Sequence, residues 1–143
     1  MKLITDKKDL EGSAYFEFLP REFDGQHWND ASVFVWYQNV SLFDSLLKEY
    51  IQDYRPYAYM TIGAQRAHKL AEDLLEYADA VTVTDAMSVT QLGIRYEIHP
   101  RDVDWLEDEW DTAQAQLASM LRELGLWLQQ NVSEEGTLSV LGL

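Results

Sequence analysis

The three histidines are the first candidates for chemistry, because a histidine titrates near neutral pH and can serve as acid, base or metal ligand. They are His27, His68 and His99. Their spacing matches no metal-binding helix motif, and the chain has no cysteine to complete a metal or thiolate site. His27 lies in a polar segment with Asp30 nearby, and such a pair could transfer protons. Because no nucleophile motif accompanies them, we expect that the protein is not an enzyme. The alternative is an enzyme whose active site, around His27 and Asp30, matches no known motif.

Carboxylates are far more abundant than any other group that could do chemistry. The chain has 25 Asp and Glu against 11 Lys and Arg, a formal net charge of -14 and a sequence pI of about 4.4. Glycosidases use a pair of carboxylates, but carboxylate pairs are so abundant in this chain that finding one does not indicate a glycosidase. The spacing of a calcium-binding loop is missing, as are the glycine patterns that bind phosphate. We therefore expect no cofactor and no metal.

The negative charge is concentrated in one part of the chain. Residues 1–21 carry four basic and four acidic side chains, so all the net charge lies in residues 22–143. The densest segment is residues 101–111, with the sequence RDVDWLEDEWD. On a helix, Asp104, Asp108 and Asp111 fall on the face opposite the apolar stripe, and Trp105 lies at the boundary. The plainest reading is a stable helix start with a solvated face, because carboxylates near a helix N-terminus are stabilising.

A second acidic group lies in the later turns of a predicted helix over residues 64–80. Its members are Glu72, Asp73, Glu76 and Asp79, and Arg66 and Lys69 precede them. This order opposes the helix dipole, and two glutamates four residues apart repel each other mildly. Acids kept where local helix physics disfavours them indicate a use for the charge.

A negative surface with aromatic side chains is suited to binding a positively charged cleft of another protein. Opposite charges accelerate association, and aromatic anchors slow release. Direct nucleic-acid binding is not expected, because phosphate contacts need a surplus of Lys and Arg. We predict a basic protein partner, whose natural example is an enzyme with a groove built for nucleic acid. The predicted partner-binding residues are Asp104, Trp105, Asp108, Asp111, Glu72, Asp73 and Glu76.

In size, lack of cysteine and acid–aromatic runs such as residues 104–111 and 72–79, the chain resembles the small acidic immunity proteins that bacteria use against their own nuclease toxins. The resemblance is general and points to no particular immunity family. It implies a cognate toxin, tight one-to-one binding that occludes the toxin's active site, and no catalysis. It does not imply which residues contact the toxin.

Two further functions are compatible with the same charge. A nucleic-acid mimic would compete with DNA for many unrelated DNA-binding proteins. A plain oligomer-forming domain would have no special partner at all.

The elements that must position these residues alternate along the chain. The predicted strands are 14–19, 32–38, 57–62, 81–84 and 91–99, with a short extended segment at 138–141. The predicted helices run from Ser41 to just before Pro56, from 64 to 80 and from about 102 to 130, where Gly125 could bend the last one. The first two strands form a hairpin with a long loop. This order predicts an α+β fold, with a single mixed or antiparallel sheet packed by about three helices.

Nothing divides the sequence into parts, so residues 1–143 are expected to form a single globular domain. No apolar run approaches the roughly 20 residues that a membrane-spanning helix needs, and the N-terminus lacks the apolar stretch of a secretory signal. We therefore expect a cytoplasmic protein with no membrane contact.

Overall fold

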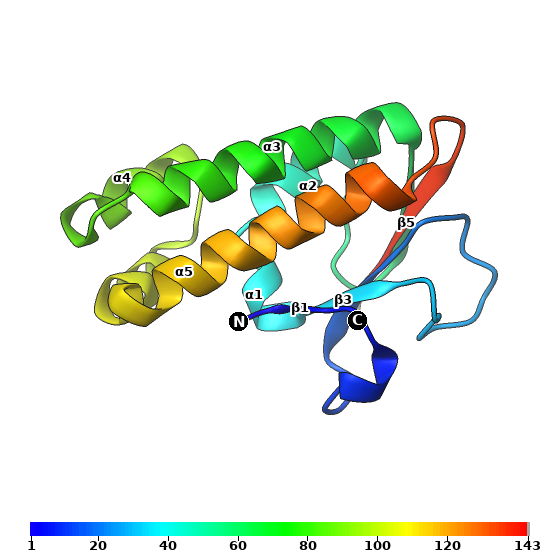
Figure 1. The fold of residues 1–143 in the computed structure, drawn as a ribbon, viewed down its shortest axis with the longest axis horizontal. Coiled ribbons are helices and arrows are strands. Elements are labelled where there is room, and N and C mark those ends of the chain that lie inside the picture. The colour runs from blue at the N-terminus through cyan, green and yellow to red at the C-terminus, as the bar shows by residue number, and fades with distance from the viewer. Residues whose placement is uncertain (143) are drawn as a thin grey trace.

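One antiparallel sheet of five strands forms one end of the molecule, and helices pack against it (Figure 1). The computed structural model describes residues 1–142, and its strand order is β1-β3-β2-β5-β4. The strands are β1 (Leu3–Ile4), β2 (Tyr15–Leu19), β3 (Val33–Trp36), β4 (Tyr59–Gly63) and β5 (Thr137–Leu141). The helices are α1 (Tyr37–Val40), α2 (Asp44–Tyr50), α3 (Ala64–Val83), α4 (Val89–Arg95) and α5 (Pro100–Asn131), with short 3-10 turns at Lys7–Asp9 and Ala86–Ser88. The predicted α+β class is confirmed.

The central hairpin of β2 and β3 is covered on both of its faces. Successive residues of β3 alternate between two apolar clusters, because successive side chains of a strand point to opposite faces of the sheet. Val33 and Val35 pack in the large core with the helices, whereas Phe34 packs in a smaller cluster with Tyr15 and Trp28. The uninterrupted apolar run of this strand therefore indicated burial on both faces correctly.

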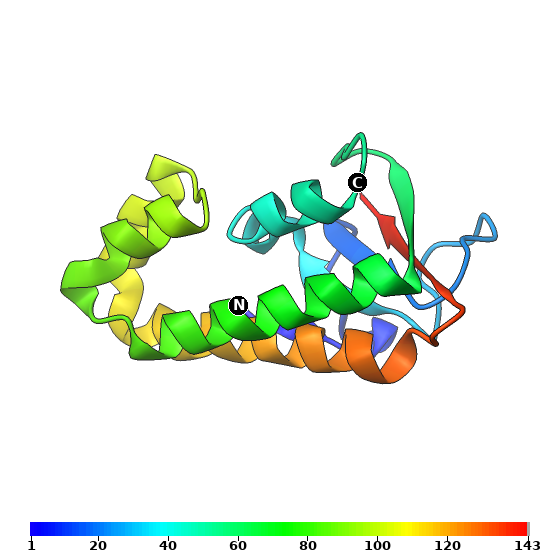
Figure 2. The ribbon, with the colours of Figure 1, turned by 90° about the horizontal axis from the view of Figure 1, so that it is seen from above.

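The two long helices α3 and α5 lie side by side and extend from the sheet to the far end of the molecule (Figures 1 and 2). The predicted apolar stripe of α5 is buried along its whole length, from Leu106 to Leu128. Gly125 does not interrupt this helix. A Cβ atom placed there would lie 3.1 Å from the carbonyl oxygen of Ala71 and 2.9 Å from Cγ of Leu75, so the missing side chain allows α3 and α5 to approach closely.

Two predicted strands are wrong. Residues 81–84 were expected to be extended, but α3 continues to Val83, and residues 91–99 contain α4 instead of a strand. The alternation of Ile94, Tyr96 and Ile98 suggested one buried strand face, yet Ile94 is 74% exposed. Helical spacing explains the burial in and next to α4, since Val89, Leu92, Gly93 and Tyr96 are buried, and Ile98 is buried in the turn that follows.

The predicted helix from Ser41 to just before Pro56 is wrong at both ends. Helix α2 begins at Asp44 and ends at Tyr50, and the short helix α1 lies before Ser41, partly in residues that were expected to be strand. The Ser41 hydroxyl donates a hydrogen bond of 2.7 Å to the carbonyl oxygen of Gln38, so this serine closes α1 and does not cap the start of a helix. Ser41 and the turn after it separate α1 from α2, and residues of both helices line a cleft that is described below.

The helix α4 and the first turns of α5 lie beyond the sheet, at the far end of the long helix pair (Figure 2). At Gly93, an added Cβ would lie 2.5 Å from a methyl carbon of Val103, so α4 is packed directly against α5. Within residues 1–142, no helix is both long and apolar enough to cross a membrane.

This contact makes Gly93→Ala destabilising. The substitution should lower the free energy of unfolding by about 1–3 kcal/mol, because the new methyl group overlaps Val103 in a packed contact. In a Val103→Ala background the same substitution should be neutral or stabilising by up to about 1 kcal/mol, since alanine has the higher helix propensity. Chemical denaturation of the four proteins of this double-mutant cycle measures both values. An equal effect in both backgrounds would contradict the described packing of α4 on α5.

Candidate functional site

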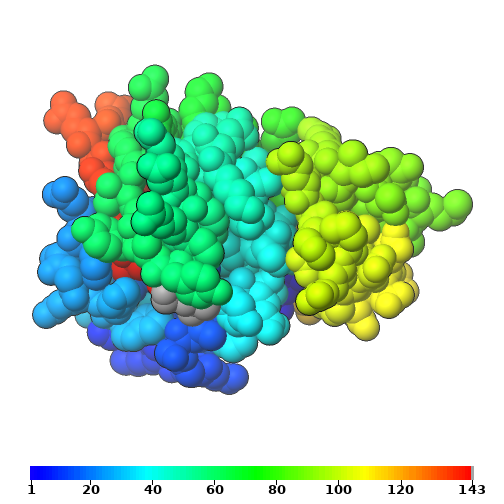
Figure 3. Space-filling model, turned by 180° about the vertical axis from the view of Figure 1, so that it is seen from behind, coloured from blue at the N-terminus to red at the C-terminus, as the bar shows by residue number. Residues whose placement is uncertain are grey.

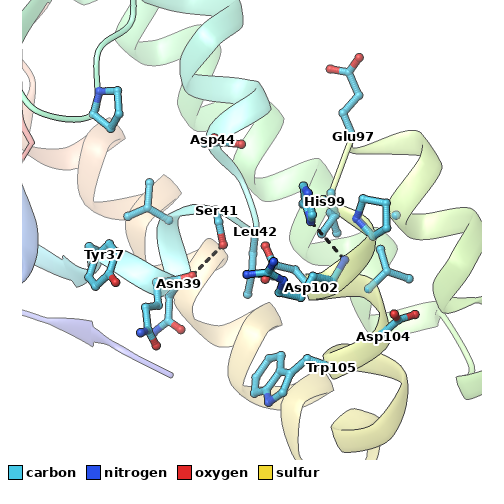
Figure 4. A pocket seen from close by; sticks show the side chains of 18 of the residues that line it. Tyr37, Asn39, Ser41, Leu42, Asp44, Glu97, His99, Asp102, Asp104 and Trp105 are labelled. Atoms are coloured by element: carbon cyan, nitrogen blue, oxygen red, sulfur yellow. Dashed lines mark hydrogen bonds between the residues drawn. The ribbon is translucent and has the colours of Figure 1, made fainter.

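A cleft of about 1430 Å³ opens between the α1–α2 segment and the α4–α5 corner. Apart from Phe16 of β2, its residues lie within 37–48 and 54–57 on one side and within 90–107 on the other, and it is called here the α1–α5 cleft. Figure 3 shows the hollow between these two walls on the surface, and Figure 4 shows the side chains that face each other across it. Segments more than thirty residues apart in the sequence therefore meet at this site.

The acidic face predicted on α5 exists and is turned toward water. Asp104, Asp108 and Asp111 are all exposed. Within residues 1–142, no Lys, Arg or His nitrogen lies within 4.0 Å of their carboxylates. Their negative charge is consequently available to a partner.

Stabilisation of the helix start does not account for these three carboxylates. The helix α5 begins at Pro100, and Asp102 is the acidic residue of its first turn. Asp104, Asp108 and Asp111 lie further along the helix, where the dipole effect has fallen off. Asp104 and Asp108 are also four residues apart, a spacing at which like charges repel. Local helix physics therefore provides no reason to keep this group of charges.

Trp105 lies beside this acidic face and has 46% of its surface exposed. It lines the α1–α5 cleft together with Asp104, and Figure 4 places both on the α5 wall, with Tyr37 on the opposite wall. Tyr37 is 40% exposed and Tyr57, another lining residue, is 78% exposed. Large aromatic side chains with this much open surface are the type that anchors protein–protein contacts.

The acidic residues of α3 are paired with cations of the same chain. Lys69 lies 3.6 Å from Glu72, Arg95 lies 2.9 Å from Glu76, and Arg122 lies 3.3 Å from Asp79. Each of these pairs is exposed, and such pairs contribute at most about 1 kcal/mol. They nevertheless reduce the charge that α3 offers to a partner.

Asp73 is held by a different contact. It is half-buried and accepts a hydrogen bond from the Tyr50 hydroxyl of α2. This bond, followed by burial, raises the pKa of Tyr50 above its ordinary value. Asp73 and Glu76 line a second, smaller hollow of about 240 Å³, whereas Asp104 lines the α1–α5 cleft. The structure thus brings Asp104, Trp105, Asp108 and Asp111 together on α5 and leaves Glu72, Asp73 and Glu76 as a separate group.

His27 and Asp30 do not contact each other as the alternative active site would require. Asp30 pairs with Lys7 at 2.7 Å, and the hydrogen bond from Lys7 lowers the pKa of Asp30 below its ordinary value. The Nδ1 atom of His27 instead lies 3.9 Å from Oε2 of Glu17, a residue of β2 that sequence reasoning did not single out.

Glu17 is a buried carboxylate that holds the loop between β2 and β3. It is 1% exposed, and it accepts hydrogen bonds of 2.9 Å from the backbone N–H groups of Trp28 and Asn29 and one of 2.6 Å from the Ser32 hydroxyl. Trp28 has a φ of 61°, in the left-handed region that is costly for a bulky residue. Three donors to one buried carboxylate fix this turn, so the role of Glu17 that the structure shows is structural.

The other two histidines also have backbone partners. A ring nitrogen of His68 lies 2.8 Å from the carbonyl oxygen of Val132, and Nδ1 of His99 accepts a hydrogen bond of 3.2 Å from the backbone N–H of Arg101. His99 therefore caps the start of α5 and positions the acidic end of that helix. Within residues 1–142, no three His, Asp or Glu side chains are placed to hold a metal ion.

Several cleft residues were not found by sequence reasoning. Tyr37 was assigned to the inside of a strand, and Ile94 and Glu97 were assigned to a strand that does not exist. Of the predicted partner-binding residues, Asp104 and Trp105 line this cleft, so the acidic run of residues 101–111 was the sequence signal that pointed to it. No protein-family model matches the chain, and neither a curated protein nor a solved structure matches it.

The role of Glu17 is tested by Glu17→Gln. The amide keeps the shape of the side chain but loses one acceptor oxygen, so a buried donor is left without a partner, and the free energy of unfolding should fall by about 1–3 kcal/mol. Hydrogen exchange of the Trp28 and Asn29 amides should accelerate. Glu22→Gln, at an exposed position of the same loop, is the matched control and should change neither quantity. Unchanged exchange in Glu17→Gln would contradict this assignment.

Proposed function

We propose that this protein is an acidic inhibitor that binds a basic protein partner and occludes that partner's active site. The partner class favoured by the charge is a nuclease-type enzyme, and the biological setting suggested by the sequence resemblance is bacterial toxin immunity in the cytoplasm. The protein itself performs no reaction in this proposal, and it uses no cofactor.

The observation that carries the proposal is the unpaired acidic face of α5 beside an exposed tryptophan. Asp104, Asp108 and Asp111 have no cation of their own chain within 4.0 Å among the described residues, and Trp105 is 46% exposed next to them. A structural role for the three carboxylates is disfavoured, because they lie beyond the first turn and repel each other. The net charge of -14 adds long-range attraction toward a positively charged protein.

Such charge acts mainly on the rate of association. Electrostatic steering raises association rate constants to about 10⁸–10⁹ M⁻¹s⁻¹ at low salt, compared with about 10⁵–10⁶ M⁻¹s⁻¹ for neutral surfaces. An inhibitor of a harmful enzyme gains from fast capture, because the enzyme acts during any delay. The proposal therefore predicts an association rate that falls as salt is added.

The charge-reversal variant D104K/D108K/D111K tests the proposal. Association with a partner captured from the native cells at low salt should slow at least about tenfold, because the steering charge is inverted. The melting temperature should stay close to that of the natural protein, since the three side chains are exposed. Stopped-flow or surface-binding kinetics at several salt concentrations measures the effect.

The matched control is E123K/E134K/E135K, which makes the same change in net charge with exposed residues near the other end of α5. This control should slow association much less at physiological salt. The electrostatic screening length there is about 8 Å, so charges far from the contact surface attract the partner only weakly. Equal slowing by both variants would show that net charge alone acts and that the face on α5 has no special role. If the natural protein captures many unrelated DNA-binding proteins with similar affinity, a general nucleic-acid mimic replaces the inhibitor of one partner.

A further inference from the structure

We infer that the α1–α5 cleft is the receptor groove for an arginine-bearing segment of the basic partner. This inference rests on the proposed function and adds to it where the partner inserts and what chemistry it presents. The outer acidic face of α5, represented by Asp108 and Asp111, then steers the partner, and the cleft retains it.

The size of the cleft favours a protein segment over a small molecule. Its volume of about 1430 Å³ exceeds the roughly 300–1000 Å³ typical of small-molecule sites. The cleft is open along the surface between its two walls, as Figure 3 shows, so a continuous chain can lie in it. A helix or an extended strand of a partner commonly docks in such a groove with its side chains in pockets.

The charge of the lining selects a cationic occupant. Lys48 is already paired with Asp44 at 2.9 Å. The remaining charged lining residues are Glu97, Asp102, Asp104 and Glu107, with Arg101 as the cation among them. The wall formed by residues 97–107 is therefore negative, and Figure 4 shows Glu97, Asp102 and Asp104 arranged along it. Phosphate groups, an anionic membrane surface and a second copy of this chain with a charge of -14 would all be repelled.

The aromatic residues of the cleft specify arginine among the cationic side chains. Trp105 offers an open ring on the same wall as these carboxylates, and Tyr37 and Tyr57 offer theirs on the opposite wall. A guanidinium group is planar and can stack on a ring while it donates paired hydrogen bonds to a carboxylate, which an ammonium group cannot do. Acid and aromatic side chains in one groove therefore match arginine better than lysine.

A fluorescent sensor can test this directly, because the chain has no cysteine and a single introduced one is labelled selectively. Ile94→Cys places an environment-sensitive dye on an exposed side chain that lines the cleft. Leu126→Cys places the same dye on an exposed residue of α5 outside the cleft lining and serves as the control. The probe is a synthetic amphipathic peptide of arginine and leucine, compared with the same peptide carrying lysine or glutamate in place of arginine.

The arginine peptide should give a saturable signal with the dye at position 94 and none with the dye at position 126. The lysine peptide should bind more weakly, and the glutamate peptide should not bind. A signal of equal size at both positions, or equal affinity for arginine and lysine, would overturn the inference.

Paired variants separate the cleft from its surroundings. The cleft variant D102N/D104N should weaken binding of the arginine peptide about tenfold or more, whereas D108N/D111N, which removes the same charge outside the cleft lining, should weaken it much less. Tyr57→Ala removes an aromatic ring that is 78% exposed, so it should weaken binding without lowering the melting temperature. Equal weakening by the two aspartate pairs would overturn the inference.

The same variants distinguish failure of this inference from failure of the proposed function. If a captured partner dissociates at the same rate from Tyr57→Ala and Asp102→Asn as from the natural protein, but D104K/D108K/D111K slows its association, the cleft inference fails and the inhibitor proposal stands. If the peptide binds in the cleft as described but no cationic protein is inhibited, the inhibitor proposal fails and the cleft remains a site for arginine-bearing segments.

Discussion

The close contact between α3 and α5 is the constraint on which the rest of the structure depends. Without a side chain at Gly125, the backbone of α5 approaches Ala71 and Leu75 of α3, and the buried stripe from Leu106 to Leu128 completes the contact. This pair of helices is anchored on the sheet at one end and reaches well beyond it at the other (Figure 1). The acidic start of α5 is therefore held rigidly away from the sheet, where it forms one wall of a cleft.

The distribution of cations decides which acidic residues remain available. With 11 Lys and Arg against 25 Asp and Glu, most carboxylates must stay unpaired. Lys69, Arg95 and Arg122 all pair with acids of α3, so the helix whose acids oppose its dipole receives neutralising partners. The acids of α5 beyond its first turn receive none among the described residues. This difference between two acidic helices is invisible in the composition, because it depends on which side chains the fold brings together.

Sequence reasoning predicted the parts that local patterns determine. The hairpin of β2 and β3, the long helix α5 with its buried stripe from Leu106 to Leu128, and the exposure of Asp104, Asp108 and Asp111 all follow from periodicity, and the structure shows each of them. The predicted strand over residues 91–99 failed because its alternation of apolar residues was real but incidental, and packing of Gly93 on Val103 favours a helix. The cleft was unpredictable for the same reason, since its two walls come from segments that meet through tertiary packing alone.

Two residues with a left-handed backbone conformation lie in turns that position the segments discussed above, the loop between β2 and β3 and the wall of the α1–α5 cleft. Trp28 adopts a φ of 61° where the buried carboxylate of Glu17 holds its N–H group, and Glu97 adopts a φ of 52° just beyond Tyr96, the C-cap of α4. At Glu97 this conformation ends the helix and turns the chain toward His99, which caps α5. The sharp turn lets α4 fold back beside α5, and it places Glu97 in the cleft lining. The left-handed backbone at this residue therefore accompanies an acidic wall to which the turn after α4 and the start of α5 both contribute carboxylates.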